Sequence, residues 1–433
     1  MIQRNHSTST HQSYNQSNFV SSRNQRNNKI PAYDWDEMSQ QTLLGAFYYG
    51  FVAVQIPGGV LAAKIGGKNV VTFVIISTSV IAALSPWTAG IHVGLLITLR
   101  ILDGIVQGMV IPAVYTLLSK WSSVDDRSVM VSIFFAGMPI GGIVANYMSG
   151  LICSSYKIGG WPMSFYIYSM LGPILAIIWI IWVTESPEKD EITLKTNMPS
   201  KDKTQGSIPL YDILSSKPVW AIAIGKFTSV LGFNFLVIEM PTFLSTILGV
   251  HIRMIGLLTS IPGLTAAVTG ICSAALADYI IRQKHLSVLK TRKLFVLIGF
   301  GVSGVSFIAL AFTCYRVLGL EILYIIILAM FGFNNASVMP NPMDITVEYV
   351  GIVAGATHMV ASFTGFIIPI ITGFLIKEQN TIEQWVALFL IIGGMQILGM
   401  VFFIIFAEAK QQEWSEKNYR EEKTNILITA KKQ

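Results

Sequence analysis

Arg100, Asp103 and Gln107 are the residues whose types and spacing best fit chemistry in this sequence. They lie within an apolar stretch, and their spacing places all three side chains on one face of a helix. A guanidinium binds anions through its planar set of donors, and a carboxylate in a dry cavity can carry a proton. Two interpretations stay open. Either Arg100 and Asp103 serve an anionic ligand and its coupling ion, or they pair with each other and stiffen the protein.

Lys226 is a second cation within an apolar stretch, and it is the other candidate to bind an anion. A lysine near the end of a span can instead extend its ammonium to the membrane surface. Tyr49 and Asn234 are neutral side chains that can donate hydrogen bonds to the same ligand. The sequence contains no nucleophile–histidine–acid arrangement, phosphate-binding loop or cluster of metal ligands. It therefore predicts no enzyme, no cofactor and no metal site.

The composition indicates a membrane protein. Of 433 residues, 52% are apolar and 12% are charged, whereas soluble domains have about 25% charged residues. Of the 54 charged residues, 35 lie in 1–41, 185–217, 278–293 and 408–433. A charge inside a span is therefore rare, and it is expected to face a partner or water. The net charge of +6 lies in loops and indicates membrane orientation rather than nucleic-acid binding.

Eleven apolar segments reach the length of about 20 residues that a helix needs to cross a bilayer. They predict an all-α polytopic membrane protein with five spans, a polar loop and six further spans. The first five are 42–62, 69–90, 94–118, 129–152 and 162–184. The other six are 219–244, 254–277, 294–314, 319–340, 350–376 and 383–407. The chain is accordingly divided into an N-terminal tail (1–41), a first bundle (42–184), a loop (185–218), a second bundle (219–407) and a C-terminal tail (408–433).

Lysine and arginine counts predict the orientation. The segments on the side of the C-terminus hold 20 of these residues, and the loops on the opposite side hold 4. By the positive-inside rule the C-terminus is cytoplasmic and the N-terminal tail is external, although four basic residues in that tail argue the other way. The tail is rich in Asn, Gln and Ser, a composition typical of disorder. Its sequons predict glycosylation at Asn5 and Asn15.

Several short segments together form a pattern that is specific for one protein family. These segments are Leu43–Phe51, Gln55–Gly59, Arg100–Gly104, Trp121–Ser128, Gly160–Tyr166, Glu239–Phe243, Leu276–Asp278 and Arg292–Lys293. With them, the chain from about residue 33 to 415 resembles the anion:cation symporter family of the major facilitator superfamily. That family includes sialin-like, vesicular glutamate and type I sodium/phosphate transporters. The resemblance implies the fold of this superfamily, with a substrate cavity between two helix bundles.

The family pattern has twelve helices, and residue 42 begins the match to its second helix. The first helix, which supplies an arginine to the anion site in relatives, is therefore missing here. In proton-coupled relatives a glutamate stands at the position of Gln107, which cannot titrate. The chain then either resembles the phosphate branch, or Asp103 carries the proton instead.

A further set of residues is assigned to gating or to structure. It comprises Lys64, Gly66, Gly67, Lys68, Glu239, Asp278, Arg282, Asn341, Asp344 and His358. The first four form a tight turn between two spans, and Asp278 and Arg282 stand at the equivalent point of the second half. Glu239 is expected at the membrane interface, where Pro241 would end the helix. His358 is expected to bond to a neighbouring helix.

The leading hypothesis for function is a secondary active symporter of small anions, either inorganic phosphate or organic anions, that works by alternating access. Its partners would be the anionic substrate, a co-transported cation (Na⁺ or H⁺) and the lipid bilayer. Its location would be the plasma membrane or a lysosomal or vesicular membrane. The alternative is a truncated or non-transporting relative that acts only by association with other membrane proteins.

Overall fold

The computed structural model describes residues 33, 35–154, 159–186, 208–313, 316–376 and 380–415. Asn5 and Asn15, with most of the N-terminal tail, lie outside the described residues, as do most of the loop 185–218 and much of the C-terminal tail. Helices are the only regular secondary structure in the described ranges. The all-α class is therefore confirmed.

Eleven helices in the described part of the chain are long and apolar enough to cross a membrane, as predicted. The first five spans are α2 (Glu37–Ile65), α3 (Gly67–Ile91), α4 (Val93–Gln107) with α5 (Val110–Trp121), α6 (Arg127–Ser154) and α7 (Trp161–Trp182). The other six are α10 (Lys217–Thr246), α11 (Ile252–Arg282), α12 (Val288–Thr313), α13 (Val317–Gly332), α15 (Val350–Ser362) with α16 (Thr364–Leu375), and α17 (Ile382–Phe406). The short elements are α9 (Leu210–Ser215), η2 (Phe333–Ala336) and α14 (Asn341–Ile345).

Pro241 does not end its helix, and this expectation is wrong. The helix α10 continues through Pro241 to Thr246. A proline inside a helix removes one backbone hydrogen bond. Beyond it, Phe243 and Leu244 are fully buried in the main hydrophobic core of the second half. Burial of these side chains offsets the lost hydrogen bond, so the helix persists.

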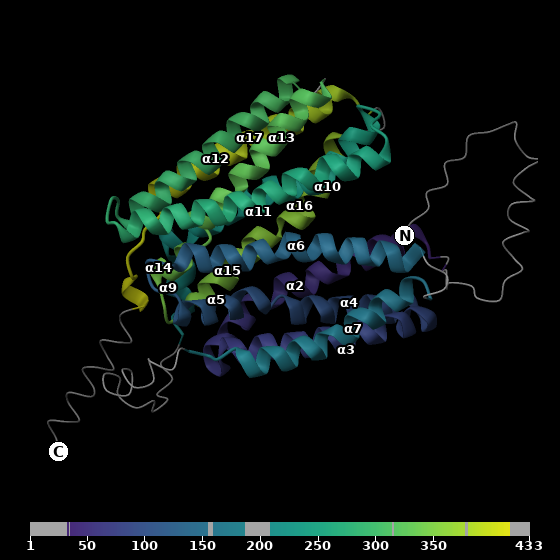
Figure 1. The fold of residues 1–433 in the computed structure, drawn as a ribbon, viewed down its shortest axis with the longest axis horizontal. Helices are drawn as coiled ribbons and strands as arrows, with labels where there is room; N and C mark the ends of the chain where they lie inside the picture. The colour runs from purple at the N-terminus through teal and green to yellow at the C-terminus, as the bar shows by residue number, and fades with distance from the viewer. Residues whose placement is uncertain are drawn as a thin grey trace, which may run out of the picture.

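The helices form two groups, α2–α7 and α10–α17. In Figure 1 most of the second group lies above the first, while α14 and α15 lie beside α5 and α2. The groups share a pairing pattern: α3 packs on α7 as α12 packs on α17, and α2 packs on α4 as α11 packs on α13. The groups meet where α2 and α5 pack on α15 and where α6 packs on α11. This pattern is an internal repeat in three dimensions, although the sequence similarity between the halves is faint.

The helix α10 has no counterpart in the first group among the described residues. It packs against α15 and α17, and 61% of its most apolar stretch is buried. Among the described residues, no helix takes the equivalent place against α6 and α7. The first group therefore presents an open side where the second group is closed by α10.

Two glycines bring α2 and α4 into close contact. A Cβ atom on Gly104 would lie 2.0 Å from the carbonyl oxygen of Phe47. A Cβ atom on Gly50 would lie 2.1 Å from the carbonyl oxygen of Ile101. Because neither position has room for a side chain, the backbones approach closely. This contact sets the direction in which Arg100 and its neighbours on α4 point.

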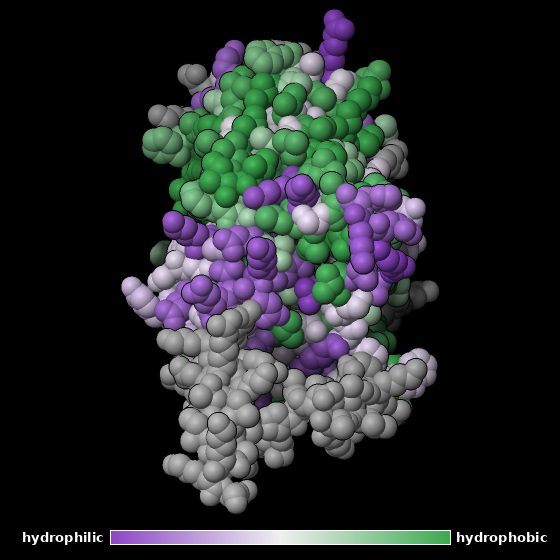
Figure 2. Space-filling view, turned by 90° about the vertical axis from the view of Figure 1, so that its left-hand side faces the viewer, coloured by the Kyte–Doolittle hydropathy of each residue, from purple (hydrophilic) through white to green (hydrophobic). Residues whose placement is uncertain are grey.

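The basic segments that were predicted to share one side of the membrane lie together at one end of the molecule. We call this end, which contains 64–68, 120–127, Glu185 and 278–293, the basic end. Glu185 contacts both Lys68 and Lys120, and Arg282 contacts Asp126. Figure 2 looks at this end and shows hydrophilic residues spread across it, with hydrophobic residues along the flank above. The sequence-based prediction of which loops lie together agrees with this arrangement.

Candidate functional site

The predicted face of α4 brings its three polar side chains together. Gln107 donates a hydrogen bond from Nε2 to Oδ1 of Asp103 over 2.8 Å. Nη1 of Arg100 lies 3.9 Å from Oδ2 of Asp103. Asp103 is buried between these two partners. The pairing of Arg100 with Asp103, which is one of the two interpretations of the sequence, is therefore present, and it also orients Arg100.

Arg100 is partly exposed and lies beside α7. Its side chain is 38% exposed, and its Cζ atom lies 5.9 Å from the ring centre of Phe165 on α7. A guanidinium has five N–H donors, and the single long contact with Asp103 leaves donors available. Arg100 can therefore bind an anion without losing its contact with Asp103.

Lys226 is fully buried in α10 at the contact between the two groups of helices. Its Nζ donates a hydrogen bond to Oγ1 of Thr357 over 3.1 Å and lies 4.8 Å from the ring centre of Tyr115. No carboxylate in the described ranges pairs with it. The interpretation that Lys226 extends to the membrane surface is wrong, because the closed packing of α5, α10 and α15 covers the whole side chain.

The other two predicted binding residues, Tyr49 and Asn234, both contact α16. Tyr49 is 61% exposed and stacks on Phe366 of α16, with 5.6 Å between ring centres. Asn234 donates a hydrogen bond from Nδ2 to Oγ1 of Thr364 over 3.3 Å. Both side chains therefore belong to contacts with α16. The structure does not bring them into direct contact with Arg100 or Lys226.

His358 differs from its expected setting, whereas Glu239 is buried. Nδ1 of His358 has no hydrogen-bond partner in the described part of the chain, and the ring instead lies 6.3 Å from that of Phe51. The expected bond to a neighbouring helix is therefore not formed through this atom. Glu239 is only 8% exposed. It is therefore buried within the second group of helices, and its position at the membrane interface stays a prediction.

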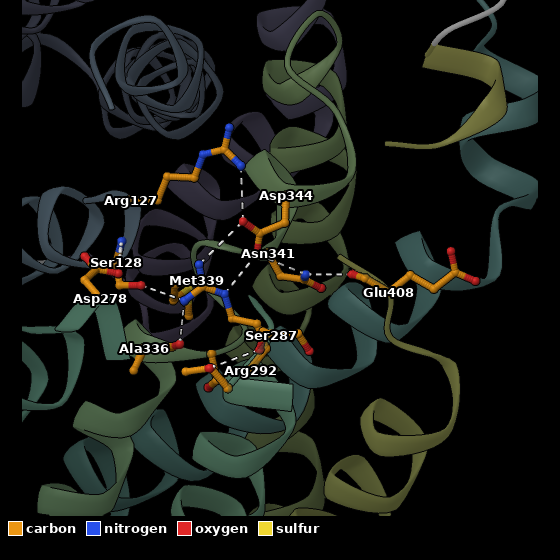
Figure 3. Close-up of polar contacts among 12 residues, drawn as sticks. Arg127, Ser128, Asp278, Ser287, Arg292, Ala336, Met339, Asn341, Asp344 and Glu408 are labelled. Carbon is orange, nitrogen blue, oxygen red and sulfur yellow. Dashed lines mark hydrogen bonds and ion pairs between the residues drawn. The ribbon is translucent and has the colours of Figure 1, made fainter. Parts of the chain in front are cut away.

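A buried polar network joins the two groups at the basic end (Figure 3). Asp344 of α14 accepts from Nε of Arg292 over 2.9 Å and from Nη1 of Arg127 over 3.2 Å. Nη1 of Arg292 also donates to Oγ of Ser128 over 2.6 Å and to the carbonyl oxygen of Ala336 over 2.8 Å. Because Arg127 and Ser128 begin α6 while Arg292 lies on α12, the network crosses between the groups.

Asp278 and Asn341 extend this network. Asp278 of α11 accepts from the backbone N–H groups of Ser128 and Val129, the latter over 2.8 Å. It therefore caps the first turn of α6 from the other group, where the free N–H groups of a helix favour an anion. Asn341 donates from Nδ2 to Asp344 over 3.4 Å and to the carbonyl oxygen of Glu408 over 2.9 Å.

The glycine turn is held by Glu185, which directly follows α7. Gly66 has φ of +93°, a conformation that favours glycine. Glu185 accepts from the backbone N–H groups of Gly67 and Lys68 over 3.0 Å and 2.9 Å, and from Nζ of Lys120 over 2.5 Å. Lys68 in turn donates from Nζ to the carbonyl oxygen of Ile180 over 2.9 Å. The turn is thus tied to α5 and α7 rather than to the other group of helices.

Burial raises the pKa of Glu185, but the hydrogen bond from Lys120 and those from the backbone of Lys68 and Gly67 act in the opposite direction and prevail. The net result is a pKa below the ordinary value of 4.5. Glu185 is therefore held as a carboxylate at neutral pH, and it pins the turn between α2 and α3. Lys64 precedes the same turn and lies in the last helical turn of α2.

Sequence reasoning missed Glu185, Arg127, Arg292 and Tyr115 as residues with a role. Arg127 and Arg292 belong to motifs that carry the family resemblance, which was the only available signal. Glu185 follows a span directly, but its partners lie 65 or more residues away in the chain. Tyr115 sits in an apolar stretch without any pattern. Among the described residues no group of His, Cys, Asp or Glu could hold a metal ion.

The chain is similar to known proteins over most of its length. The family model of the Major Facilitator Superfamily matches residues 29–369. Sialin of Homo sapiens is 32% identical over 391 residues, which cover 88% of this chain and 78% of sialin. Sodium-dependent phosphate transport protein 1 of Rattus norvegicus is 30% identical, with 90% of this chain and 85% of that protein covered. Vesicular glutamate transporter 3 of Danio rerio is 28% identical, with 91% and 68% covered.

Among solved structures, the proton:xylose symporter XylE has the same fold. The TM-score is 0.69 at 16% identity, and the match covers 89% of this chain and 91% of XylE. The fucose:proton symporter FucP matches with a TM-score of 0.63 at 14% identity. At these identities the likeness concerns the arrangement of helices alone. It confirms the predicted fold class.

Proposed function

The chain belongs to the Major Facilitator Superfamily, and we propose that this multi-pass membrane protein is a symporter that moves a small anion by alternating access. The similar proteins named sialin, sodium-dependent phosphate transport protein 1 and vesicular glutamate transporter support an anionic substrate. Inorganic phosphate or a small organic anion is the proposed substrate. The proposed location is the plasma membrane or a lysosomal or vesicular membrane.

The observation that carries this proposal is the setting of Lys226. Its ammonium is buried at the contact between the two groups of helices, and no carboxylate of the described residues pairs with it. Burying an unpaired charge is costly, and a buried lysine with a purely structural role is normally paired with an acid. A cation that is left without a counter-ion suits a site whose counter-ion is the transported substrate. Arg100, which is partly exposed on α4 of the other group, is the second proposed anion-binding residue.

The remaining polar residues take supporting roles in this proposal. Asp103 holds Arg100 and is the proposed coupling acid if the co-ion is H⁺, while Gln107 orients its carboxylate. Tyr49 and Asn234 donate hydrogen bonds to the substrate when the cavity closes on it. Sodium remains the alternative co-ion, because the phosphate-transporting relative is sodium-dependent by name.

The network at the basic end is the proposed gate on that side. Arg127 and Ser128 from the first group meet Asp278, Arg292 and Asp344 from the second. Arg282 adds an exposed contact with Asp126, and Asn341 supports Asp344. Since all of these contacts cross or support the interface, separation of the two groups at this end must break them. The turn next to this gate is formed by Lys64, Gly66, Gly67 and Lys68. We assign Glu239 on α10 and His358 on α15 a supporting role within the second group.

Uptake into liposomes tests the proposal. The purified chain is reconstituted, and uptake of labelled phosphate, urate, sialate and glutamate is measured with an inward sodium gradient, a proton gradient or a membrane potential. We expect uptake of at least one anion with one of these drivers, and a higher KM in Lys226→Ala. Protein-free liposomes give the background. Absence of uptake for all four anions under all three drivers contradicts the proposal.

A second candidate function follows from the open side of the first group. In the second group α10 packs on α15 and α17, whereas no described helix takes the equivalent place against α6 and α7. An uncovered apolar face suits association with another membrane protein. A non-transporting role of this kind predicts no uptake, together with a stable complex in detergent extracts.

A further inference from the structure

Tyr115 connects the first group of helices to two separate parts of the second. It lies on α5 and is only 1% exposed. Its hydroxyl donates a hydrogen bond to the carbonyl oxygen of Met339 over 2.7 Å. The face of its ring lies 4.8 Å from Nζ of Lys226 on α10. One side chain of the first group therefore holds both a turn and a buried cation of the second.

Lys226 is weakly satisfied in this position. An ammonium has three N–H donors, but Lys226 forms only one hydrogen bond within the described residues, to Oγ1 of Thr357. The Thr357 hydroxyl donates to the carbonyl oxygen of Val353 over 2.7 Å, so its lone pair is free to accept from the lysine. The aromatic ring supplies the remaining stabilisation as a cation–π contact. A carboxylate or phosphate would bind this ammonium more strongly than the ring does.

We propose that Tyr115 and Lys226 form an anion-sensitive latch between the two groups of helices. Without an anion, Lys226 rests on the ring of Tyr115 and the contact near the basic end is closed. An anion bound to Lys226 draws the ammonium away from the ring and removes one of the two contacts that Tyr115 makes with the second group. The inference rests on the proposed function and adds Tyr115 as a positioning residue that links anion binding to separation of the groups.

A cysteine pair can report whether the groups are in contact. Nδ2 of Asn335 lies 3.3 Å from Oγ of Ser132, and these residues belong to η2 and α6. Ser132→Cys and Asn335→Cys are introduced into a chain whose Cys153, Cys272 and Cys314 are replaced by serine. The rate of disulfide formation in proteoliposomes then measures closure. All variants carry the same pair, so its own effect cancels.

The first test is a double-mutant cycle without any anion of the panel. We expect Tyr115→Leu to slow cross-linking by about thirtyfold, the size of a desolvated cation–π contact. Tyr115→Phe keeps the ring and is expected to slow it less. In the Lys226→Met background, Tyr115→Leu is expected to lose most of its effect. Equal effects of Tyr115→Leu with and without Lys226 overturn the latch.

The second test adds phosphate, urate, sialate or glutamate. The anion that the wild-type chain takes up is expected to slow cross-linking in the wild type and to leave Lys226→Met unchanged. A full response in Lys226→Met overturns the latch even when uptake is normal. Absence of uptake by the wild type contradicts the proposed function instead, and the anion-free cycle still decides whether the contact holds. If Tyr115→Leu does not fold, the response of Lys226→Met to the transported anion decides the proposal.

Discussion

Arg292 and Asp344 form an ion pair that is closed to solvent. Nε of Arg292 lies 2.9 Å from Oδ2 of Asp344, and the two side chains are 0% and 1% exposed. The other oxygen of Asp344 faces Arg127, whose Nη1 lies 3.2 Å away. One carboxylate therefore compensates two guanidinium groups, and these come from the two different groups of helices. The contact at the basic end depends strongly on this single acid.

Asp344→Asn is expected to destabilise the closed basic end. The substitution removes the one carboxylate that both guanidinium groups contact directly, and breaking a buried pair in this way costs roughly 3–5 kcal/mol. We expect a lower thermal midpoint in detergent and faster labelling of a cysteine placed near the interface. Thermal unfolding and labelling rates measure the two effects.

Asp126→Asn is the matched control, because Asp126 pairs with Arg282 across the same interface but its side chain is 47% exposed. An exposed pair contributes about 1 kcal/mol or less. Equal destabilisation by the two substitutions would show that the buried network has no special role.

Glu185 predicts a pH dependence of stability at the glycine turn. Its pKa is lowered in the folded protein, so its contribution is fully present above the ordinary value of 4.5 and is lost as the pH falls through the lowered pKa. Glu185→Gln is expected to be less stable than wild type near neutral pH, with a difference that shrinks in acid. Thermal midpoints of both chains across this pH range test it, and a difference that is constant with pH would count against it.

Gly104→Ala is expected to separate α2 from α4. The added Cβ would lie 2.0 Å from the carbonyl oxygen of Phe47, which is a backbone atom and cannot move aside cheaply. Overpacking of this kind costs about 1–3 kcal/mol. Gly141→Ala on α6 is the control, because nothing lies within 4 Å of its Cβ position. A helix gains up to about 1 kcal/mol from Gly to Ala, so thermal midpoints should shift in opposite directions.

Asp103→Asn tests the coupling role of the α4 face. If Asp103 carries the transported proton, the wild-type uptake rate changes with external pH and the rate of the variant does not. The hydrogen bond from Gln107 can be kept by the asparagine oxygen, so the local geometry is preserved. Uptake is measured over a series of external pH values, with Asp126→Asn as the control. Identical pH profiles for wild type and Asp103→Asn would exclude Asp103 as the coupling acid.

Much of the fold could be predicted from the sequence because the rules involved are local. A bilayer sets the length of each apolar helix, and that rule alone located all eleven spans of the described chain. The helical repeat placed Arg100, Asp103 and Gln107 on one face, and the structure joins them around Asp103. Each of these inferences needs only one continuous stretch of about 20 residues.

Contacts between distant segments could not be predicted in this way. Asp344 meets Arg127 across 217 positions of the chain, and Lys226 meets Tyr115 across two groups of helices. No local pattern specifies which helix covers a given face, and this also explains the errors at Pro241 and Lys226. Packing of Phe243 and Leu244 sustains the helix beyond Pro241, and packing of α5 and α15 on α10 buries Lys226. Hydropathy and helical periodicity therefore specify the elements, while side-chain burial between the elements determines which charges become partners.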